Sequence, residues 1–198
     1  MKKTLYFIRH GESRDEAEGW FSGHSDHPLT EQGQKQMHHI GFRFHVTPLD
    51  AIYVSPLERA HEAARIIGRY VLANIIVEGG LTDWNREGLL TGLTPEQAQR
   101  HYPEEVRKLA YYRSHALQGE KYEDFVRRVH QTFEKILASD EDRIMIVAHG
   151  RVIGTWLKEI HAISDDPQQI DHPAHALEMR VNRKLQPEIL NSYVIQGV

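Results

Sequence analysis

Two short apolar runs, each followed by a His-Gly pair, constrain this chain more than any other feature of its sequence. The first run, residues 5–8, leads into an Arg-His-Gly sequence whose histidine is His10. The second run, residues 144–147, leads into an Ala-His-Gly sequence whose histidine is His149. Short apolar runs beside turn-forming residues are typical of buried strands. If both strands belong to one parallel sheet, the two imidazoles lie at the same edge of that sheet.

Strand and helix patterns alternate along the chain, which favours a mainly parallel sheet with helices on both faces. The expected strands cover residues 4–9, 51–54, 75–77, 144–148, 177–181 and 189–195. The expected helices cover residues 30–45, 56–71, 94–113 and 122–138, and another follows residue 150. Loops are expected over residues 10–30 and 79–92. We predict an α/β fold, a three-layer α/β/α sandwich, formed by one domain over residues 1–198.

Threonine and proline mark the starts of three of these helices. Thr30 and Thr94 are suited to the N-cap position, where a hydroxyl accepts a hydrogen bond from the first turn. Pro56 and Pro95 are suited to the first turn, where a backbone N–H has no partner inside the helix. These signals place the helix starts more firmly than the helix ends.

The composition excludes several classes of function. The net charge of −4 at pH 7 gives no electrostatic reason to expect a nucleic acid or an anionic membrane as partner. The chain has no cysteine, so disulfides and thiolate chemistry are excluded. No apolar stretch approaches the roughly 20 residues that a membrane span needs. The first apolar run is not followed by the small residues of a signal-peptide cleavage site. We therefore expect a cytoplasmic protein, and the sequence predicts neither a metal site nor a cofactor.

The strand-end residues have the chemistry that a phosphoryl-transfer site needs, which is a nucleophile surrounded by cationic hydrogen-bond donors. His10 can attack phosphorus through one ring nitrogen if a backbone carbonyl holds the other. Arg9 and Arg59 offer planar guanidinium groups that match phosphate oxygens. His149 can donate a hydrogen bond to the same phosphate, and the backbone at Gly150 adds N–H groups. Each of these residues also has a simpler structural explanation, as a strand-end histidine or a solvated helix arginine.

Five segments together resemble the histidine phosphatase superfamily, in its phosphoglycerate-mutase-like branch. They keep the family's order and approximate spacing from one end of the chain to the other. The segments are residues 9–13 (RHGES), 23–33 (GHSDHPLTEQG), 55–60 (SPLERA), 119–129 (GEKYEDFVRRV) and 148–150 (AHG). The resemblance implies that His10 becomes transiently phosphorylated. It also implies a phosphate pocket lined by three further side chains: Arg9, Arg59 and His149.

The resemblance extends to the substrate contacts and to the proton donor. It implies that the backbone and side chains around Ser22 and Gly23 touch the substrate. It also implies an acidic residue after the third strand, which protonates the leaving group. Asp83 stands at that position, where the family usually has glutamate, and Glu87 is the second candidate. Trp84 and Arg86, in the same segment, either shape the entrance to the site or only support their own loop.

The chain departs from the family pattern at three positions near the pocket. Glu16 stands where the family often has asparagine, and we count it among the substrate-binding residues. A carboxylate there repels a phosphate dianion unless it turns away or is protonated. Trp20 stands where arginine is frequent, and Ala63 replaces a common threonine.

The sequence is best explained as a phosphatase that acts on a small phosphorylated metabolite through a phosphohistidine. One alternative is a mutase that returns the phosphoryl group to a bound product. Resembling mutases carry a longer, arginine-rich insertion where residues 115–122 are short, although Arg100, Lys108 and Arg113 can partly substitute. The other alternative is a relative without catalysis that binds phosphate or a protein. Neither the natural substrate, expected to be a small-molecule phosphate ester, nor the oligomeric state follows from the sequence.

Overall fold

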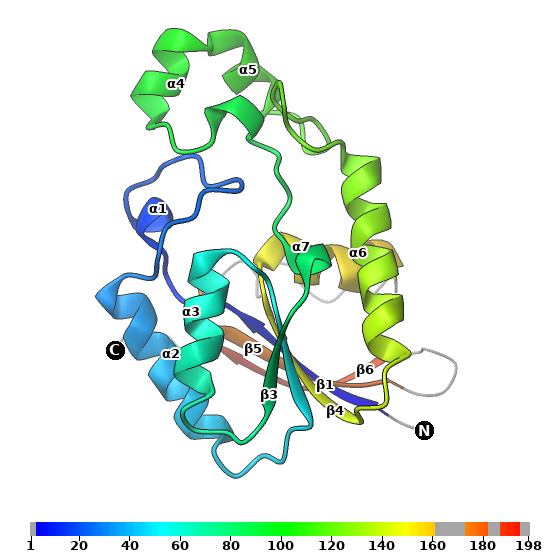
Figure 1. Ribbon diagram of the computed structural model, residues 1–198. Helices are drawn as coiled ribbons and strands as arrows, with labels where there is room; N and C mark the ends of the chain where they lie inside the picture. Colours follow the sequence, from blue (N-terminus) through cyan, green and yellow to red (C-terminus); the bar gives the residue numbers. More distant parts are fainter. Residues whose placement is uncertain (1–2, 161–172, 182–186, 195–198) are drawn as a thin grey trace.

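A six-stranded sheet forms the centre of the protein, and helices cover both of its faces (Figure 1). The computed structural model describes residues 3–160, 173–181 and 187–194. The strands are β1 (Lys3–Arg9), β2 (Ala51–Val54), β3 (Asn74–Val77), β4 (Arg143–Ala148), β5 (His175–Val181) and β6 (Pro187–Val194). Their order across the sheet is β3-β2-β4-β1-β5-β6. Each expected strand is present, and residue 195, predicted to end the last one, lies outside the described residues.

The sheet is mainly parallel, as the sequence predicted. Strands β3, β2, β4 and β1 pair in parallel, while β5 is antiparallel to both of its neighbours, β1 and β6. The two strands that end in His-Gly pairs, β1 and β4, are direct neighbours, with Arg9 opposite Ala148. The carboxyl ends of β1, β2 and β4 therefore meet at one edge of the sheet.

Side chains alternate between two cores along the central strand, which produces the three layers. Leu5 and Phe7 of β1 pack on one face, with α6 (Tyr122–Leu137) and α7 (Gly150–Thr155). Tyr6 and Ile8 pack on the other face, with α2 (Glu31–Phe44) and α3 (Glu58–Ile67). Because successive strand residues point to opposite faces, an unbroken apolar run is what a strand covered on both sides requires. The predicted α/β/α sandwich is confirmed.

Two of the predicted helix caps are confirmed. The Thr30 hydroxyl accepts a hydrogen bond from the Gly33 amide at 3.0 Å, at the start of α2. The Thr94 hydroxyl accepts one from the Gln97 amide at 3.2 Å, with Pro95 at the first position of α4 (Pro95–His101). The expectation for Pro56 was wrong, because α3 begins only at Glu58.

Several element boundaries differ from the prediction. The expected loop over residues 10–30 contains a short helix, α1 (Arg14–Ala17), and residues 79–92 contain two short 3-10 helices (Gly79–Leu81 and Gly88–Leu90). The single helix expected over 94–113 is divided into α4 and α5 (Pro103–Lys108), because proline cannot donate the hydrogen bond that continues a helix. The helix after β4 passes from α7 directly into a π-helix (Trp156–Ile160).

A smaller apolar cluster holds α4 and α5 beyond the carboxyl edge of the sheet (Figure 1). Its centre is formed by Leu90, Ala98 and Ala116, with Phe21 from the segment after α1 packed against it. The backbone amide of Phe21 also donates to the Leu93 carbonyl at 3.0 Å. The segment after α1 is therefore attached both to the sheet edge and to this outer cluster.

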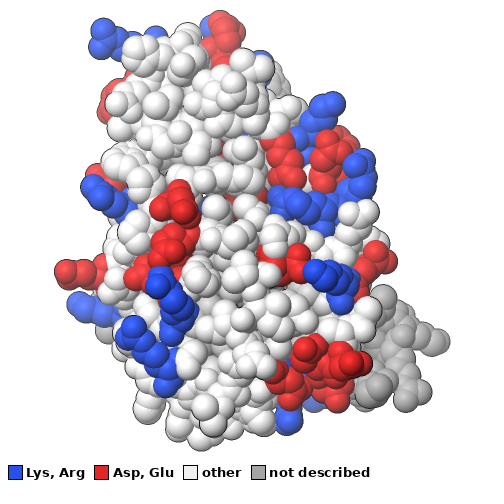
Figure 2. Space-filling view, in the orientation of Figure 1, with Lys and Arg blue, Asp and Glu red and all other residues white. Residues whose placement is uncertain are grey.

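Acidic and basic side chains are interspersed over the face of the molecule that Figure 2 shows. This distribution agrees with the small net charge of −4. Across the described ranges, none of the helices combines the length and the apolar character that crossing a bilayer requires.

Candidate active site

A cavity of about 260 Å³ lies where β1, β2 and β4 end. Backbone hydrogen bonds fix the three strand ends beside one another: the His10 amide donates to Ala148 at 3.2 Å, and the Ser55 amide donates to Val147 at 3.1 Å. The residues that line the cavity are Arg9, His10, Glu16, Ser22, Arg59, Asp83, His149, Gly150 and Arg151. Every residue predicted for the site lines this cavity except Gly23.

His10 is oriented by its own backbone. Its side chain is buried, at 2% exposure, and Nδ1 lies 2.7 Å from the Gly11 carbonyl oxygen. A carbonyl oxygen only accepts hydrogen bonds, so Nδ1 carries the proton and Nε2 of the neutral ring carries the lone pair. Burial lowers the pKa of His10 to about 4, and the charges of Arg59 and Arg9 act in the same direction against Glu16. At neutral pH His10 is therefore an uncharged imidazole with a free electron pair on one defined nitrogen.

Glu16 lies inside the cavity and is ionised. Its Oε1 accepts a hydrogen bond from Arg9 Nη2 at 2.5 Å, and its Oε2 accepts one from the Ser13 amide at 3.2 Å. Burial by itself raises the pKa of Glu16, but Arg9 and the Ser13 amide stabilise the carboxylate, and the pKa is lowered. The sequence left two ways to avoid repulsion of a phosphate, turning away or protonation, and neither is found. Instead the carboxylate partly neutralises Arg9.

Arg59, in the first turn of α3, is fully enclosed at 1% exposure. Its Nη1 donates to the Ser25 carbonyl at 2.8 Å, and its Nη2 donates to the Gly23 carbonyl at 3.2 Å. Nη2 also lies 3.6 Å from Asp83 Oδ2. Gly23, predicted to touch the substrate, is not among the lining residues, and its carbonyl oxygen orients the guanidinium.

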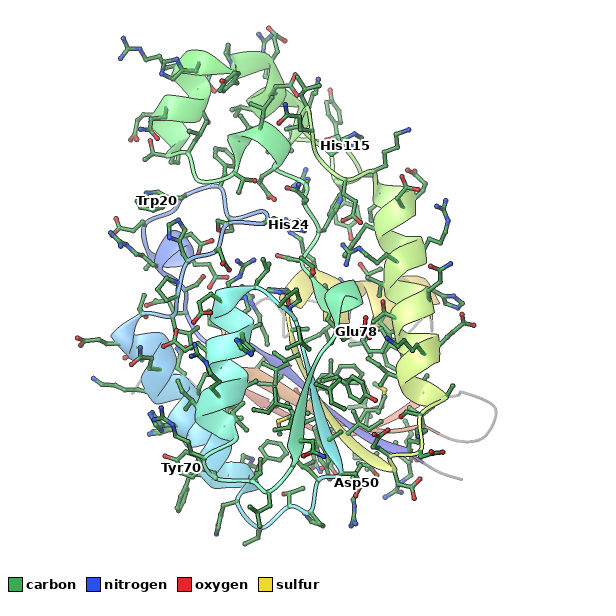
Figure 3. All side chains as sticks on the ribbon, in the orientation of Figure 1. Trp20, His24, Asp50, Tyr70, Glu78 and His115 are labelled. Atoms are coloured by element: carbon green, nitrogen blue, oxygen red, sulfur yellow. The ribbon has the colours of Figure 1, made fainter. Side chains whose placement is uncertain are left out.

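The segment that holds Arg59 is in turn held by Asp15 and His24. The Ser25 hydroxyl donates to Asp15 Oδ2 at 2.6 Å, and Asp15 is completely buried. Burial raises the pKa of Asp15, but the hydroxyls of Ser13 and Ser25 outweigh this and lower it. His24 Nε2 lies 2.7 Å from the backbone oxygen of Asp83, so its side chain joins the segment after α1 to the segment after β3 (Figure 3).

His149 contacts both His10 and the end of β2. Its ring lies edge-on to the His10 ring, with centroids 5.0 Å apart at 67°, and its Nε2 is 2.8 Å from Ser55 Oγ. Its Nδ1 is buried and makes no hydrogen bond to the described residues. Burial, and next the charge of Arg59, lower the pKa of His149 well below its ordinary value. His149 is therefore a neutral hydrogen-bonding group in a cavity whose positive charge comes from arginine.

The two candidates for the acid differ in their surroundings. Asp83 lines the cavity; its Oδ1 accepts the Trp84 amide at 2.9 Å and its Oδ2 faces Arg59. Glu87 is not among the lining residues, and both of its oxygens bind Arg151, at 2.7 and 3.0 Å. The geometry favours Asp83 over Glu87 for proton transfer.

Sequence reasoning missed two residues of the site, Arg151 and Asp15. Arg151 follows Gly150 in the first turn of α7, where the pattern gave only backbone N–H groups. Asp15 stands in a charged segment that looks solvated, and only the fold shows that it is buried. Neither Glu12 nor Trp20 is among the lining residues: Glu12 accepts a hydrogen bond from the Thr30 hydroxyl at 2.7 Å, and Trp20, beside α1, packs against the His27 ring (Figure 3).

Comparison with known proteins identifies the family. An adenosylcobalamin/alpha-ribazole phosphatase of Salmonella typhimurium is 31% identical over 162 residues, which are 79% of this chain and 78% of that protein. A 2,3-bisphosphoglycerate-dependent phosphoglycerate mutase of Parvibaculum lavamentivorans is 28% identical over 176 residues, 84% of this chain and 83% of that protein. The crystal structure of an alpha-ribazole phosphatase from Shigella flexneri has the same fold, with a TM-score of 0.80 at 20% identity over 94% of each chain. Residues 5–183 match the model of the histidine phosphatase superfamily (branch 1), and the chain belongs to this family.

Proposed function

We propose that the protein is a phosphatase that hydrolyses a small phosphorylated metabolite through a phosphohistidine at His10. The observation that carries this proposal is the tautomer of His10, whose Nδ1 is held by the Gly11 carbonyl. The remaining nitrogen, Nε2, then has the lone pair that attack on phosphorus requires. The cavity around it also contains the guanidinium groups that bind phosphate oxygens.

In the first step, His10 Nε2 forms a bond to phosphorus while the ester P–O bond breaks. The Nδ1 proton stays on the ring and remains hydrogen-bonded to Gly11. Arg9 and Arg59 stabilise the charge that spreads over the phosphoryl oxygens. Asp83 gives its proton to the departing alkoxide.

In the second step, a water molecule attacks the phosphorus of the phosphohistidine. The Asp83 carboxylate removes a proton from this water, and the P–N bond breaks with its electron pair returning to His10 Nε2. Inorganic phosphate leaves, and Asp83 is again protonated for the next ester. The two steps restore the starting state without a cofactor.

The described residues favour a phosphatase over a mutase. A mutase needs additional cations near the pocket to hold a bisphosphate, and the candidates for this role are Arg100, Lys108 and Arg113. Lys108 pairs with Glu105 at 2.7 Å, Arg113 lies over the Tyr122 ring, and Arg100 is exposed on α4. None of the three is among the residues that line the cavity.

Replacing His10 tests the nucleophile. We expect His10→Ala to lower the rate of p-nitrophenyl phosphate hydrolysis at least about 1,000-fold between pH 5 and 8, because the covalent route is lost. The exposed His101→Ala serves as a matched control and keeps the wild-type rate. Alkaline quenching of the wild-type reaction with labelled ester traps a phosphorylated chain, and His10→Ala traps none.

The same assay separates the alternatives. Equal rates for the wild type and His10→Ala contradict the phosphohistidine, and no turnover of any phosphate ester by the wild type supports a binding protein without catalysis. Turnover that depends on a bisphosphate primer supports a mutase. A screen of phosphorylated metabolites then identifies the substrate.

Replacing the two carboxyl groups tests the acid. We expect Asp83→Asn to lower kcat for an alkyl phosphate by about 100- to 10,000-fold, because an alkoxide leaves poorly without a proton. The loss is smaller for p-nitrophenyl phosphate, whose leaving group needs less assistance. Glu87→Gln keeps most of the activity toward both esters. The reverse result, with Asp83→Asn active and Glu87→Gln inactive, assigns the acid to Glu87.

A further inference from the structure

A second cavity, of about 130 Å³, adjoins the first and shares Gly150 and Arg151 with it. The residues that line it come from α6, α7, the following π-helix, and the segments before α6 and after β3. Of the two shared residues, Gly150 was predicted for the site from the sequence and Arg151 was not. Six side chains give the lining its chemical character: Trp84, Arg86, Tyr112, Tyr122, Arg151 and Lys158.

The charged side chains that line this second cavity are all cations. Three cations line it, Arg86, Arg151 and Lys158, and no acidic residue does so in the part of the chain that the structure describes. The first cavity, in contrast, contains Glu16 and Asp83. Glu87, which does not line the cavity, pairs with Arg151, so the excess positive charge of the lining comes from Arg86 and Lys158. Excess positive charge in a concave site favours an anionic ligand.

Two of the three cations are fixed in place before any ligand binds. The Arg86 guanidinium donates to the carbonyls of Tyr111, at 2.8 Å, and Ser114, at 3.1 Å. Arg151 is held by both oxygens of Glu87. Burial lowers the pKa of Arg86, and the nearby charge of Arg151 lowers it further. The Glu87 carboxylate opposes the effect of Arg151, and a bound anion reduces the remaining repulsion between the two guanidinium groups without requiring either of them to move.

One wall of the second cavity is aromatic and rigid. The Trp84 ring stacks on Phe125, with centroids 5.5 Å apart at 9°, and meets the Tyr122 ring edge-on at 5.3 Å. Tyr112 continues this wall, 5.8 Å from Tyr122. Such a surface suits the carbon framework of a ligand, while the cations suit a charged group at its end.

We propose that the second cavity is a specificity subsite that binds an anionic group on the alcohol part of the substrate. The preferred substrate is then a phosphate monoester with a second anionic group, such as a carboxylate or another phosphate. The inference rests on the proposed phosphatase function, because it places the ester phosphate beside His10. Arg151 lies between the two anions, and Lys158 binds the distal one.

Two aryl esters of similar shape test this subsite. The two esters are 4-nitrophenyl phosphate and 4-carboxyphenyl phosphate. Each has a planar group opposite the ester, but only the carboxylate carries a net charge. The 3-carboxyphenyl isomer places the carboxylate at a different angle to the ester. The measured quantity is the kcat/KM of a carboxylate ester divided by the kcat/KM of the nitro ester. We expect Lys158→Gln to lower this ratio about ten-fold for at least one carboxylate ester, because KM for that ester rises. Lys35→Gln, on the exposed side of α2, leaves this ratio unchanged.

A binding measurement separates failure of the subsite from failure of the catalytic proposal. A binding measurement needs no turnover, so it can use the His10→Ala protein. Calorimetry gives the Kd of 4- and 3-carboxyphenyl phosphate for His10→Ala and for the double variant that also carries Lys158→Gln. About ten-fold weaker binding of at least one of them in the double variant supports the subsite even if no hydrolysis is found. The subsite is refuted if Lys158→Gln changes neither the kinetic ratio nor the Kd of either carboxylate ester.

Discussion

Glu16 places a negative charge in the cavity where the proposed phosphate substrate also carries one. Its ion pair with Arg9 withdraws part of the positive charge that otherwise binds phosphate oxygens. The same carboxylate also opposes the lowering of the His10 pKa, through its charge. We therefore expect this site to bind phosphate weakly compared with a site that has a neutral side chain at the same position.

Replacing Glu16 by glutamine tests this effect. We expect Glu16→Gln to lower KM for phosphate esters, and the inhibition constant of inorganic phosphate, about three- to ten-fold, because the repulsion is removed while an acceptor for Arg9 remains. Competitive inhibition by inorganic phosphate at pH 7 measures it, with the exposed Glu18→Gln as control. Weaker inhibition in Glu16→Gln means that the charge of Glu16 serves mainly to orient Arg9.

At the scale of single residues, the sequence was informative where a residue follows a strand directly. His10, Ser55 and His149 are placed by strand ends, and the alternation of strands and helices brings those ends together. Asp15 and Arg151 had no comparable signal. Their roles depend on burial and on partners distant in sequence, which a local pattern does not contain.

At the scale of elements, the segment from Ser22 to Asp26 determines how Arg59 is presented. Gly23 has a φ of 42°, a region that favours glycine, and a Cβ at this position would overlap the Thr91 hydroxyl. Its carbonyl accepts one of the two backbone hydrogen bonds that orient Arg59. A change at Gly23 therefore reaches the phosphate site through the backbone.

Comparing two glycine substitutions tests this connection. We expect Gly23→Ala to lower kcat/KM at least about ten-fold and to destabilise the fold by about 1–3 kcal/mol, because the loop must shift. Gly79→Ala is the control, since a Cβ there meets open space. Kinetics and urea unfolding of both variants measure the two effects. Unchanged kinetics in a folded Gly23→Ala protein argue that Arg59 does not depend on this loop.

The elements themselves were predicted unevenly. Strands and long helices followed from apolar patterns, because each buries one or two faces in a large core. The short helices α1, α4 and α5 were misplaced or merged. Their stability comes from contacts with other segments, such as the cluster around Leu90, and such contacts leave little periodicity in the sequence.

At the scale of the whole molecule, the buried histidines make stability depend on pH. The pKa of His10 is about 4 in the folded protein and about 6.5 in an unfolded chain. Between these values the unfolded chain binds more protons, so the folded state loses stability as the pH falls. The lowered pKa of His149 acts in the same direction.

Urea unfolding at two pH values tests this linkage. We expect the contribution of His10 to the free energy of unfolding to fall by about 2 kcal/mol between pH 7 and pH 5. His10→Asn removes the titrating ring, so the variant loses less stability than the wild type over this interval. The linkage is wrong if the two proteins lose the same amount.

The central position of β1 has a consequence for how the chain folds during synthesis. Its partners in the sheet are residues 143–148 and 175–181, so β1 leaves the ribosome long before either partner is made. Until then its apolar side chains have no sheet to join, and contacts this distant in sequence form slowly. We expect truncated chains that end before β4 to bind chaperones or to aggregate, and we expect catalytic activity to emerge late, in one step, when β4 docks beside β1.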